Sequence, residues 1–278
     1  MIIETRELVY EIRDYIKSEV DKLKDKPKLT IIQVEGDAAS DSYVKNKKKL
    51  GAELGIEVMH HLLPNTLTQE EYEIIVKAMN QTDADGIIVQ LPLPSHVNER
   101  ALLELIDPNK DVDGLTSAQM GYLSINHSNT LIPCTAYGVL QILNSICSDL
   151  SGQDVTIVNA SNLIGKPLRE LLTQRGCTVT VCHTRTKNLK EKMRNADIVI
   201  TGIGQPYYFD SSYFTDCQII IDCGLSYHKD TGKLVGDVNL PDVEENVVTL
   251  IASGTGHTGL ATTTMLMYNT LQSKLRKE

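Results

Sequence analysis

The feature that most constrains the fold is the alternation of apolar, strand-like runs with amphipathic, helix-like stretches along most of the chain. Runs such as residues 86–90 and 197–201 are short and rich in β-branched side chains, and the segments between them are long enough for helices. This pattern is typical of α/β folds, in which helices connect parallel strands. The sequence has no solenoid-like repeat and no low-complexity tract.

The pattern forms two series of elements. The first is expected to have strands at 28–34, 56–61 and 86–90, with helices at 3–24, from Ser40, and around 68–80. The second is expected to have strands at 155–159, 178–182, 197–201 and 218–222, with helices at 163–175 and 188–195. A loop-rich stretch at 107–134 and a helix at about 135–150 separate the series, and a last helix is expected at 259–275.

These elements predict an α/β protein of two domains. Residues 1–134 would form an α/β catalytic domain, to which the C-terminal helix in 259–278 returns. Residues 135–258 would form a Rossmann-like nucleotide-binding domain with a parallel sheet. A length of 278 residues is sufficient for two domains that each bury a core.

Bulk properties exclude several functional classes. A net charge of −9 disfavours nonspecific binding to nucleic acid or to an anionic membrane. The N-terminus lacks the basic and apolar regions of a secretory signal, and no apolar run approaches the ~20 residues of a membrane span. The six cysteines show neither a CxxC pair nor zinc-like spacing. We therefore expect a cytoplasmic protein with reduced thiols and no metal site.

Lys47 lies where an apolar side chain is expected. Ser40, Asp41 and Ser42 offer N-cap chemistry for a helix whose inward stripe carries Tyr43, Lys47, Leu50 and Leu54. On that stripe the Lys47 ammonium would be desolvated, so it would lose its proton more readily and could act as an acid or base near neutral pH. The alternative is a lysine at the edge of the stripe whose ammonium reaches water.

Two further features favour a functional site. Gln90 ends a parallel-type strand, which is where α/β enzymes place ligands. Residues 110–114 form a turn with two carboxylates, Asp111 and Asp113, beside Gly114. Taken alone, that turn could be an ordinary polar surface turn.

Four motifs combine these residues. In chain order they are Tyr43-Val44-x-x-Lys47, Val89-Gln90-Leu91-Pro92-Leu93-Pro94, Lys110-Asp111-Val112-Asp113-Gly114 and Ile132-Pro133-Cys134-Thr135. Their order and spacing resemble those of the methylenetetrahydrofolate dehydrogenase/cyclohydrolase (bifunctional FolD) family, and the resemblance runs from the first helix to the last.

The resemblance implies roles for the matching residues. Lys47 would be the catalytic acid/base, Gln90 would hydrogen-bond near it, and Tyr43 would complete the catalytic group and stack on the rings of folate. Asp113 would accept hydrogen bonds from the pterin. The other residues expected to border the substrate are Leu91, Pro92, Gly256 and Leu260.

The nucleotide half departs from the family pattern. The turn after strand 155–159 lacks a GxGxxG fingerprint, and the Gly-Arg-Ser that is usual in the family reads Asn159-Ala160-Ser161. After the next strand, Thr184 and Arg185 could bind a phosphate, and no acidic residue is there to hold a free ribose 2′-OH. These residues favour NADP, with NAD possible and binding weakened. The expected cofactor-binding set is Asn159, Ala160, Ser161, Ile164, Thr184, Arg185, Gly202, Gly204 and Cys223.

The largest departure is at residues 253–260. The family typically has Pro-Gly-Gly-Val-Gly-Pro there, whereas this chain lacks those prolines and introduces His257. Two interpretations of His257 stay open, a new polar contact with a ligand and a solvated loop histidine. Gly256 and Gly259 still permit close backbone approach.

The implied function is one-carbon interconversion on tetrahydrofolate, supplying purine and formyl-methionine synthesis. A homodimeric enzyme would oxidise 5,10-methylenetetrahydrofolate with NADP and hydrolyse the methenyl product to 10-formyltetrahydrofolate. One alternative is a cyclohydrolase that has lost the dehydrogenase. Another is a non-catalytic folate- or nucleotide-binding protein, which would not need Lys47. An amino-acid or 2-hydroxy-acid dehydrogenase would not need the motifs around Gln90 and Asp113.

Overall fold

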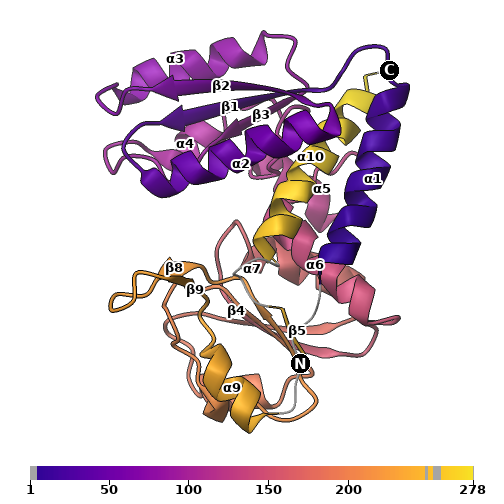
Figure 1. The fold of residues 1–278 in the computed structure, drawn as a ribbon, viewed down its shortest axis with the longest axis vertical. Helices are drawn as coiled ribbons and strands as arrows, with labels where there is room; N and C mark the ends of the chain where they lie inside the picture. Colours follow the sequence, from indigo (N-terminus) through magenta and orange to yellow (C-terminus); the bar gives the residue numbers. More distant parts are fainter. Residues whose placement is uncertain (1–4, 248–249, 253–257, 278) are drawn as a thin grey trace. The chain divides into compact units, whose positions relative to one another are not determined.

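A computed structural model of the chain describes residues 5–247, 250–252 and 258–277. The chain forms two compact units, one made of Glu11–Cys134 with Thr263–Glu278 and the other of Met1–Tyr10 with Thr135–Thr262. Each unit contains its own parallel sheet (Figure 1). The predicted α/β class with parallel sheets is therefore confirmed.

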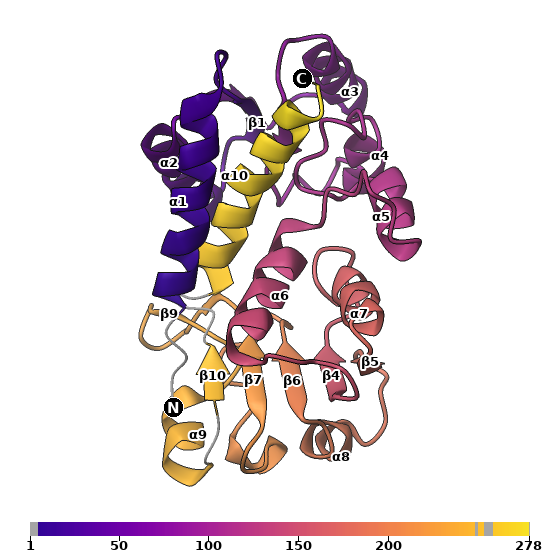
Figure 2. The same cartoon turned by 90° about the vertical axis from the view of Figure 1, so that its right-hand side faces the viewer.

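The first sheet has the strand order β2-β1-β3, and both strand pairs are parallel. Its strands are β1 (Lys28–Val34), β2 (Glu57–Leu63) and β3 (Gly86–Val89). Helices α2 (Ala38–Leu54) and α3 (Gln69–Asn80) cover opposite faces of this sheet, as both views show (Figures 1 and 2). This arrangement brings the start of α2 and the end of β3 to the carboxyl edge of the sheet.

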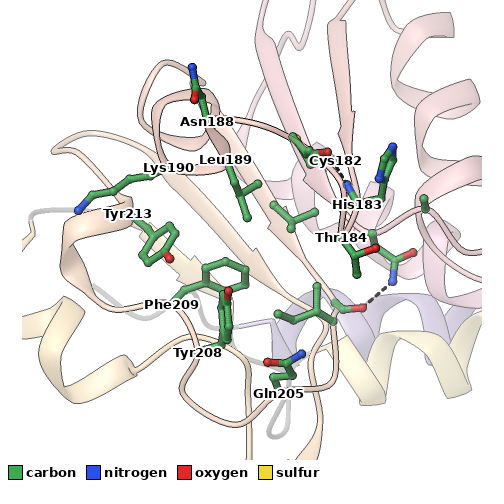
Figure 3. Close-up of a pocket in the computed structure, with 16 residues that line it drawn as sticks. Cys182, His183, Thr184, Asn188, Leu189, Lys190, Gln205, Tyr208, Phe209 and Tyr213 are labelled. Carbon is green, nitrogen blue, oxygen red and sulfur yellow. Dashed lines mark hydrogen bonds between the residues drawn. The ribbon is translucent and has the colours of Figure 1, made fainter.

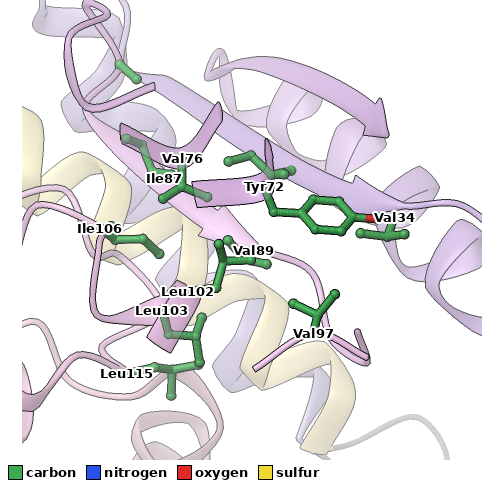
Figure 4. Packing of buried hydrophobic residues seen from close by; sticks show 12 residues of the cluster. Val34, Tyr72, Val76, Ile87, Val89, Val97, Leu102, Leu103, Ile106 and Leu115 are labelled. Atoms are coloured by element: carbon green, nitrogen blue, oxygen red, sulfur yellow. The ribbon is translucent and has the colours of Figure 1, made fainter. Parts of the chain in front are cut away.

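One hydrophobic cluster of this unit lies between α3 and one face of the sheet (Figure 4). Alternate residues of β1 and β3, such as Ile32 and Val89, point into it because side chains of a strand alternate between faces. Tyr72 of α3 is only 1% exposed, and its hydroxyl donates to the Pro64 carbonyl at 2.6 Å. The hydrogen bond satisfies the polar tip of a ring that would otherwise be costly to bury.

The second sheet has the order β10-β7-β6-β4-β5, and its strand pairs are all parallel. Its strands are β4 (Asp154–Val158), β5 (Thr178–Cys182), β6 (Ile198–Thr201), β7 (Ile219–Asp222) and β10 (Leu250–Ala252). The helices of this region include α6 (Cys134–Ile146), α7 (Gly165–Gln174) and α8 (Leu189–Arg194). The strand order reverses between β4 and β6, and such a switch point is where doubly wound sheets bind ligands.

Several elements differ from the sequence-based expectation. Helix α2 begins at Ala38 rather than Ser40, because the Asp37 carboxylate accepts hydrogen bonds from the Ser40 amide and hydroxyl at 3.1 and 2.6 Å. Asp37, not Ser40, thus supplies the capping chemistry. The stretch 107–134 contains a helix, α5 (Ser117–Ser124), whose cap is the Thr116 side chain. The sequence analysis also did not predict α4 (Glu99–Leu103), the short 3-10 helix η1 (Ser211–Tyr213), the hairpin β8 (Ser226–Tyr227) with β9 (Leu234–Val235), α9 (Leu240–Asn246) and strand β10.

The first helix, α1 (Arg6–Lys22), and the last, α10 (Gly259–Leu275), form as expected. A buried polar stripe on α10 holds loops of the first half. Asn269 Nδ2 donates to the carbonyls of Val112 and Ile132 at 2.9 and 2.8 Å. One turn later, the Ser273 hydroxyl lies 2.6 Å from the Asp85 carbonyl oxygen and 2.8 Å from that of Asn109, so it can donate to either one. These bonds confirm the predicted return of the C-terminal helix to the first half.

Replacing Asn269 by alanine should lower the free energy of unfolding by about 2 kcal/mol, because two buried carbonyls would lose their donor. Chemical denaturation followed by circular dichroism measures this change. The exposed Asp14 of α1 provides the control, since Asp14→Asn should alter stability by less than about 0.5 kcal/mol. An Asn269→Ala variant as stable as the control would mean that the bonds contribute nothing.

Candidate active site and nucleotide cavity

Lys47 and Gln90 meet at the carboxyl edge of the first sheet. Lys47 Nζ donates to Gln90 Oε1 at 2.8 Å, and Gln90 Nε2 donates to the Leu91 carbonyl at 2.7 Å. Gln90 directly follows β3 and is 9% exposed, so its carboxamide is held in one orientation by both partners. The oxygen therefore faces the lysine, and it can accept from either the ammonium or the neutral amine.

The surroundings of Lys47 disfavour its charged form. Part of the side chain reaches solvent, but the ammonium itself is enclosed. Desolvation by burial lowers the pKa of Lys47, while the negative charge of Asp113 acts in the opposite direction. An amine in this setting can lose and regain a proton closer to neutral pH than an exposed lysine can.

The loop that carries Asp113 is tightly constrained. The Asp111 carboxylate accepts from the backbone amides of Gly114 and Thr116 at 3.0 and 2.7 Å, and burial raises the pKa of Asp111 to about 6. Gly114 has a φ of +72°, and a Cβ there would come within 2.6 Å of the Leu131 carbonyl oxygen. Only glycine fits this close approach.

A buried thiol borders the same loop. Cys134 Sγ donates to the Val112 carbonyl at 3.2 Å, and burial raises the pKa of Cys134 well above its usual value. The thiol is therefore neutral and serves as a packed, weak donor rather than a nucleophile. The motif at residues 132–135 drew attention to Cys134, but the sequence did not predict that its thiol lies beside Asp113.

The remaining residues expected at this site lie in different places. Tyr43 is one helical turn before Lys47 and is 41% exposed. Leu91 is half-buried and Pro92 exposed, directly after Gln90. Leu260 lies in the first turn of α10, in the unit formed with Thr135–Thr262. Gly256 and His257 lie outside the described residues.

A polar network that the sequence analysis missed fixes the start of α2. Gln33, on β1 and 1% exposed, donates from Nε2 to Asp41 Oδ1 at 2.6 Å. Its Oε1 lies 2.8 Å from His60 Nε2, so His60 is the donor in that pair. The Ser40 hydroxyl also lies 3.3 Å from the Leu91 carbonyl, linking α2 to the loop after β3. A glutamine inside the apolar run 28–34 was the available signal.

A separate cavity of about 620 Å³ opens at the carboxyl ends of β4, β5 and β6 (Figure 3). Among its lining residues are Asn159, Ala160, Thr184 and Gly202, all expected to bind a cofactor. The other residues of that set are not on its lining, namely Ser161, Ile164, Arg185, Gly204 and Cys223. Of these, Ile164 and Cys223 pack behind Gly202, where an added Cβ would meet them at 3.3 and 3.4 Å.

One wall of the cavity is aromatic and was not predicted. The Phe209 ring makes edge-on contacts with Tyr208 and Tyr213, at centroid distances of 4.9 and 5.2 Å. Lys190 Nζ lies 5.7 Å from the centre of the Tyr213 ring (Figure 3). The signal was the cluster of aromatic residues at 207–214 in a chain with only 5% aromatic residues. Aromatic walls of this kind suit planar rings such as nucleobases.

Two buried carboxylates brace the loops around this cavity. Asp237 accepts from the amides of Ile203 and Gln205 at 2.5 and 2.8 Å. Asp222 accepts from the Thr201 hydroxyl at 3.1 Å, and burial raises its pKa to about 6. These bonds fix the loop after β6, which contains Gly202 and Gly204.

The described residues contain no group of three or more His, Cys, Asp or Glu placed to hold a metal ion. Within the same residues, no helix combines the length and apolar character that a bilayer span requires.

Comparison with known proteins covers nearly the whole chain. Residues 3–113 match the tetrahydrofolate dehydrogenase/cyclohydrolase catalytic domain, and residues 133–278 match the NAD(P)-binding domain of the same family. The bifunctional protein FolD of Bacillus pumilus is 38% identical over 279 residues, which cover 99% of this chain and 98% of that protein.

Solved structures agree with this result. The bifunctional FolD methylenetetrahydrofolate dehydrogenase/cyclohydrolase of Campylobacter jejuni superposes with a TM-score of 0.95 at 33% identity, covering 100% of this chain and 99% of that one. The Trypanosoma brucei dehydrogenase-cyclohydrolase, complexed with NADP cofactor and an inhibitor, gives a TM-score of 0.93 at 30% identity, with 100% and 98% covered. Because both domains of the family match and a relative is 38% identical over the full length, the chain belongs to the tetrahydrofolate dehydrogenase/cyclohydrolase family.

Proposed function

We propose that the chain oxidises 5,10-methylenetetrahydrofolate to the 5,10-methenyl form with NADP and hydrolyses that form to 10-formyltetrahydrofolate. The observation that carries the hydrolytic half is the enclosed Lys47 amine, 2.8 Å from Gln90 Oε1 and with its pKa lowered by burial. Residues 1–134 with 259–278 would bind folate, and residues 135–258 would bind the nucleotide. A cytoplasmic homodimer is part of the proposal, on the strength of family membership.

Hydrolysis requires one group to accept a proton and then return it. Neutral Lys47 would take a proton from the water that adds to the cationic methenyl carbon. The resulting ammonium would then donate that proton to the leaving ring nitrogen, and the neutral amine would take the hydroxyl proton that is lost as the formyl C=O forms and release it to solvent. The positive charge of the substrate would itself favour the neutral amine, because like charges disfavour each other. Gln90 would keep the amine aimed at the reacting carbon.

Binding of the folate would use the residues beside this amine. Asp113 would accept hydrogen bonds from the amino and ring NH groups of the pterin, a pattern that a carboxylate matches. Tyr43 would stack on the aromatic rings of folate, and its 41% exposure is consistent with a face open to a ligand. Leu91, Pro92, Gly256 and Leu260 would border the same substrate.

The cavity at β4, β5 and β6 fits a dinucleotide in position and chemistry. It lies at the switch point of the sheet and has an aromatic wall. Its lining includes Thr184 and Lys190 but no aspartate or glutamate, which favours a 2′-phosphate over a free ribose hydroxyl. When bound, NADP would accept the hydride from the methylene carbon. The complex of the Trypanosoma brucei relative with NADP is consistent with this choice.

A cyclohydrolase without dehydrogenase activity is the second candidate. The observation that favours it is the Asn159 side chain, whose Oδ1 accepts the Ser161 and Gly165 amides in the turn expected to bind phosphate. NADP reduction in the presence of methylenetetrahydrofolate distinguishes the candidates. Hydrolysis without any reduction would favour the second one.

The Lys47→Ala variant should lose methenyltetrahydrofolate hydrolysis by about a thousandfold, because its amine is the group proposed to carry the proton. Loss of the methenyl absorbance, corrected for the buffer-catalysed rate, measures this change. Lys49→Ala is the matched control on the exposed face of the same helix and should retain wild-type hydrolysis. Undiminished hydrolysis by Lys47→Ala would contradict the mechanism.

The Arg185→Ala variant should weaken NADP binding by about tenfold and leave NAD binding unchanged, because only NADP carries the phosphate that Arg185 would contact. Isothermal titration with each nucleotide provides the two affinities. Lys187→Ala, also exposed in the same loop, is the control. Equal losses for NAD and NADP would show that Arg185 does not recognise the 2′-phosphate.

A further inference from the structure

Several backbone donors of the turn between β4 and α7 are occupied by acceptors of the chain itself. In dinucleotide-binding folds, the first strand-to-helix turn presents free N–H groups to the diphosphate. Here the carboxamide oxygen of Asn159 accepts the Ser161 amide at 2.7 Å and the Gly165 amide at 3.1 Å. A single neutral side chain thus takes two of the donors that would otherwise face an anion.

The neighbouring donors are also used within the turn. The Ser161 hydroxyl accepts the Ile164 amide at 3.2 Å, and the Ser161 carbonyl accepts the Lys166 amide at 3.0 Å. The Leu168 amide donates to the Ile164 carbonyl at 3.0 Å, and Pro167 has no amide hydrogen to offer. An anion that bound to any of these amides would have to displace its internal acceptor.

Asn159 is also fixed from its other side. Its Nδ2 donates to the Gly202 carbonyl at 2.5 Å, which links the end of β4 to the loop after β6. The side chain is half-buried and lines the cavity. With hydrogen bonds to three different residues, its carboxamide is held in the turn rather than free to rotate away.

We propose that the Asn159 carboxamide occupies the position in which the diphosphate of a bound dinucleotide would accept hydrogen bonds, so that Asn159 limits the affinity of this site for diphosphate. The inference rests on the nucleotide site of the proposed function. Most of the affinity for the dinucleotide would then come from the parts of the cavity away from the turn, including the aromatic wall at Tyr208 and Tyr213. The adenosine end of the dinucleotide would then contribute more than the diphosphate.

Two ligands separate the diphosphate from the rest of the dinucleotide. NADP carries it, and adenosine 2′-monophosphate has the adenine, ribose and 2′-phosphate without it. In Asn159→Gly the two amides are released, and NADP should bind about fivefold more tightly, because hydrogen bonds to a charged acceptor become available. Adenosine 2′-monophosphate should bind as it does to the unaltered protein.

A second variant at the same position should change NADP affinity in the opposite direction. Asn159→Asp keeps an acceptor for both amides but adds a negative charge where the diphosphate would approach, so NADP should bind about tenfold more weakly. The matched control is Asn126→Gly, which alters an exposed asparagine outside the cavity lining at a φ of +54°, a conformation that glycine adopts readily. Its affinity for NADP should not change.

Titration calorimetry with both ligands, together with thermal unfolding of each variant, decides the matter. The inference is overturned if Asn159→Gly and Asn159→Ala leave NADP affinity unchanged or weaken it, or if both ligands gain affinity equally. If Asn159→Gly fails to fold, the Asn159→Ala and Asn159→Asp variants decide by the same criteria. Absence of binding of either ligand to every variant and to the unaltered protein overturns the nucleotide site itself, and this inference with it.

Discussion

The Lys47 amine lies where three segments distant in sequence converge, namely α2, the end of β3 and the loop at 110–114. The central position of β1 in the sheet brings the first two together, since α2 follows β1 and Gln90 pairs with β1 through its amide. The third is held by Asp111, by Gly114 and by Asn269 of α10. Much of the fold of this unit thus serves to enclose one amine beside one carboxamide and one carboxylate.

In the nucleotide half, internal hydrogen bonds within the loops determine the shape of the site. Its cavity is formed by loops that are braced internally, with Asp222 and Asp237 accepting backbone and hydroxyl donors and Asn159 satisfying the turn before α7. Such bracing preorganises a site, which reduces the entropic cost of binding. The same internal hydrogen bonds occupy backbone donors that could otherwise bind a ligand. The two halves of the reaction therefore depend on different features of this chain: desolvation of an amine in one and the availability of loop donors in the other.

The sequence predicted the elements with strong apolar periodicity. The strands at 28–34 and 178–182 and the helix at 259–275 formed with the predicted bounds, because burial decides those segments. Helix α5 was missed because it is short and its N-cap is Thr116, whose amide donates to the Asp111 carboxylate, a contact that no local pattern reveals. Lys47 could be found as a charge on an apolar stripe. The aromatic wall at Tyr208 and Tyr213 was visible only as a cluster of aromatic residues, since tertiary structure alone shows which rings face a cavity.

The most direct measurement is a titration of the Lys47 side chain by nuclear magnetic resonance, with the exposed lysines of the same protein as internal references. Burial should cause the Lys47 ammonium to lose its proton below the ordinary lysine pKa of 10.5 and before the reference lysines do. Gln90→Glu should move that transition to higher pH, because an adjacent carboxylate favours the charged amine. A Lys47 that titrates together with the exposed lysines would contradict the account.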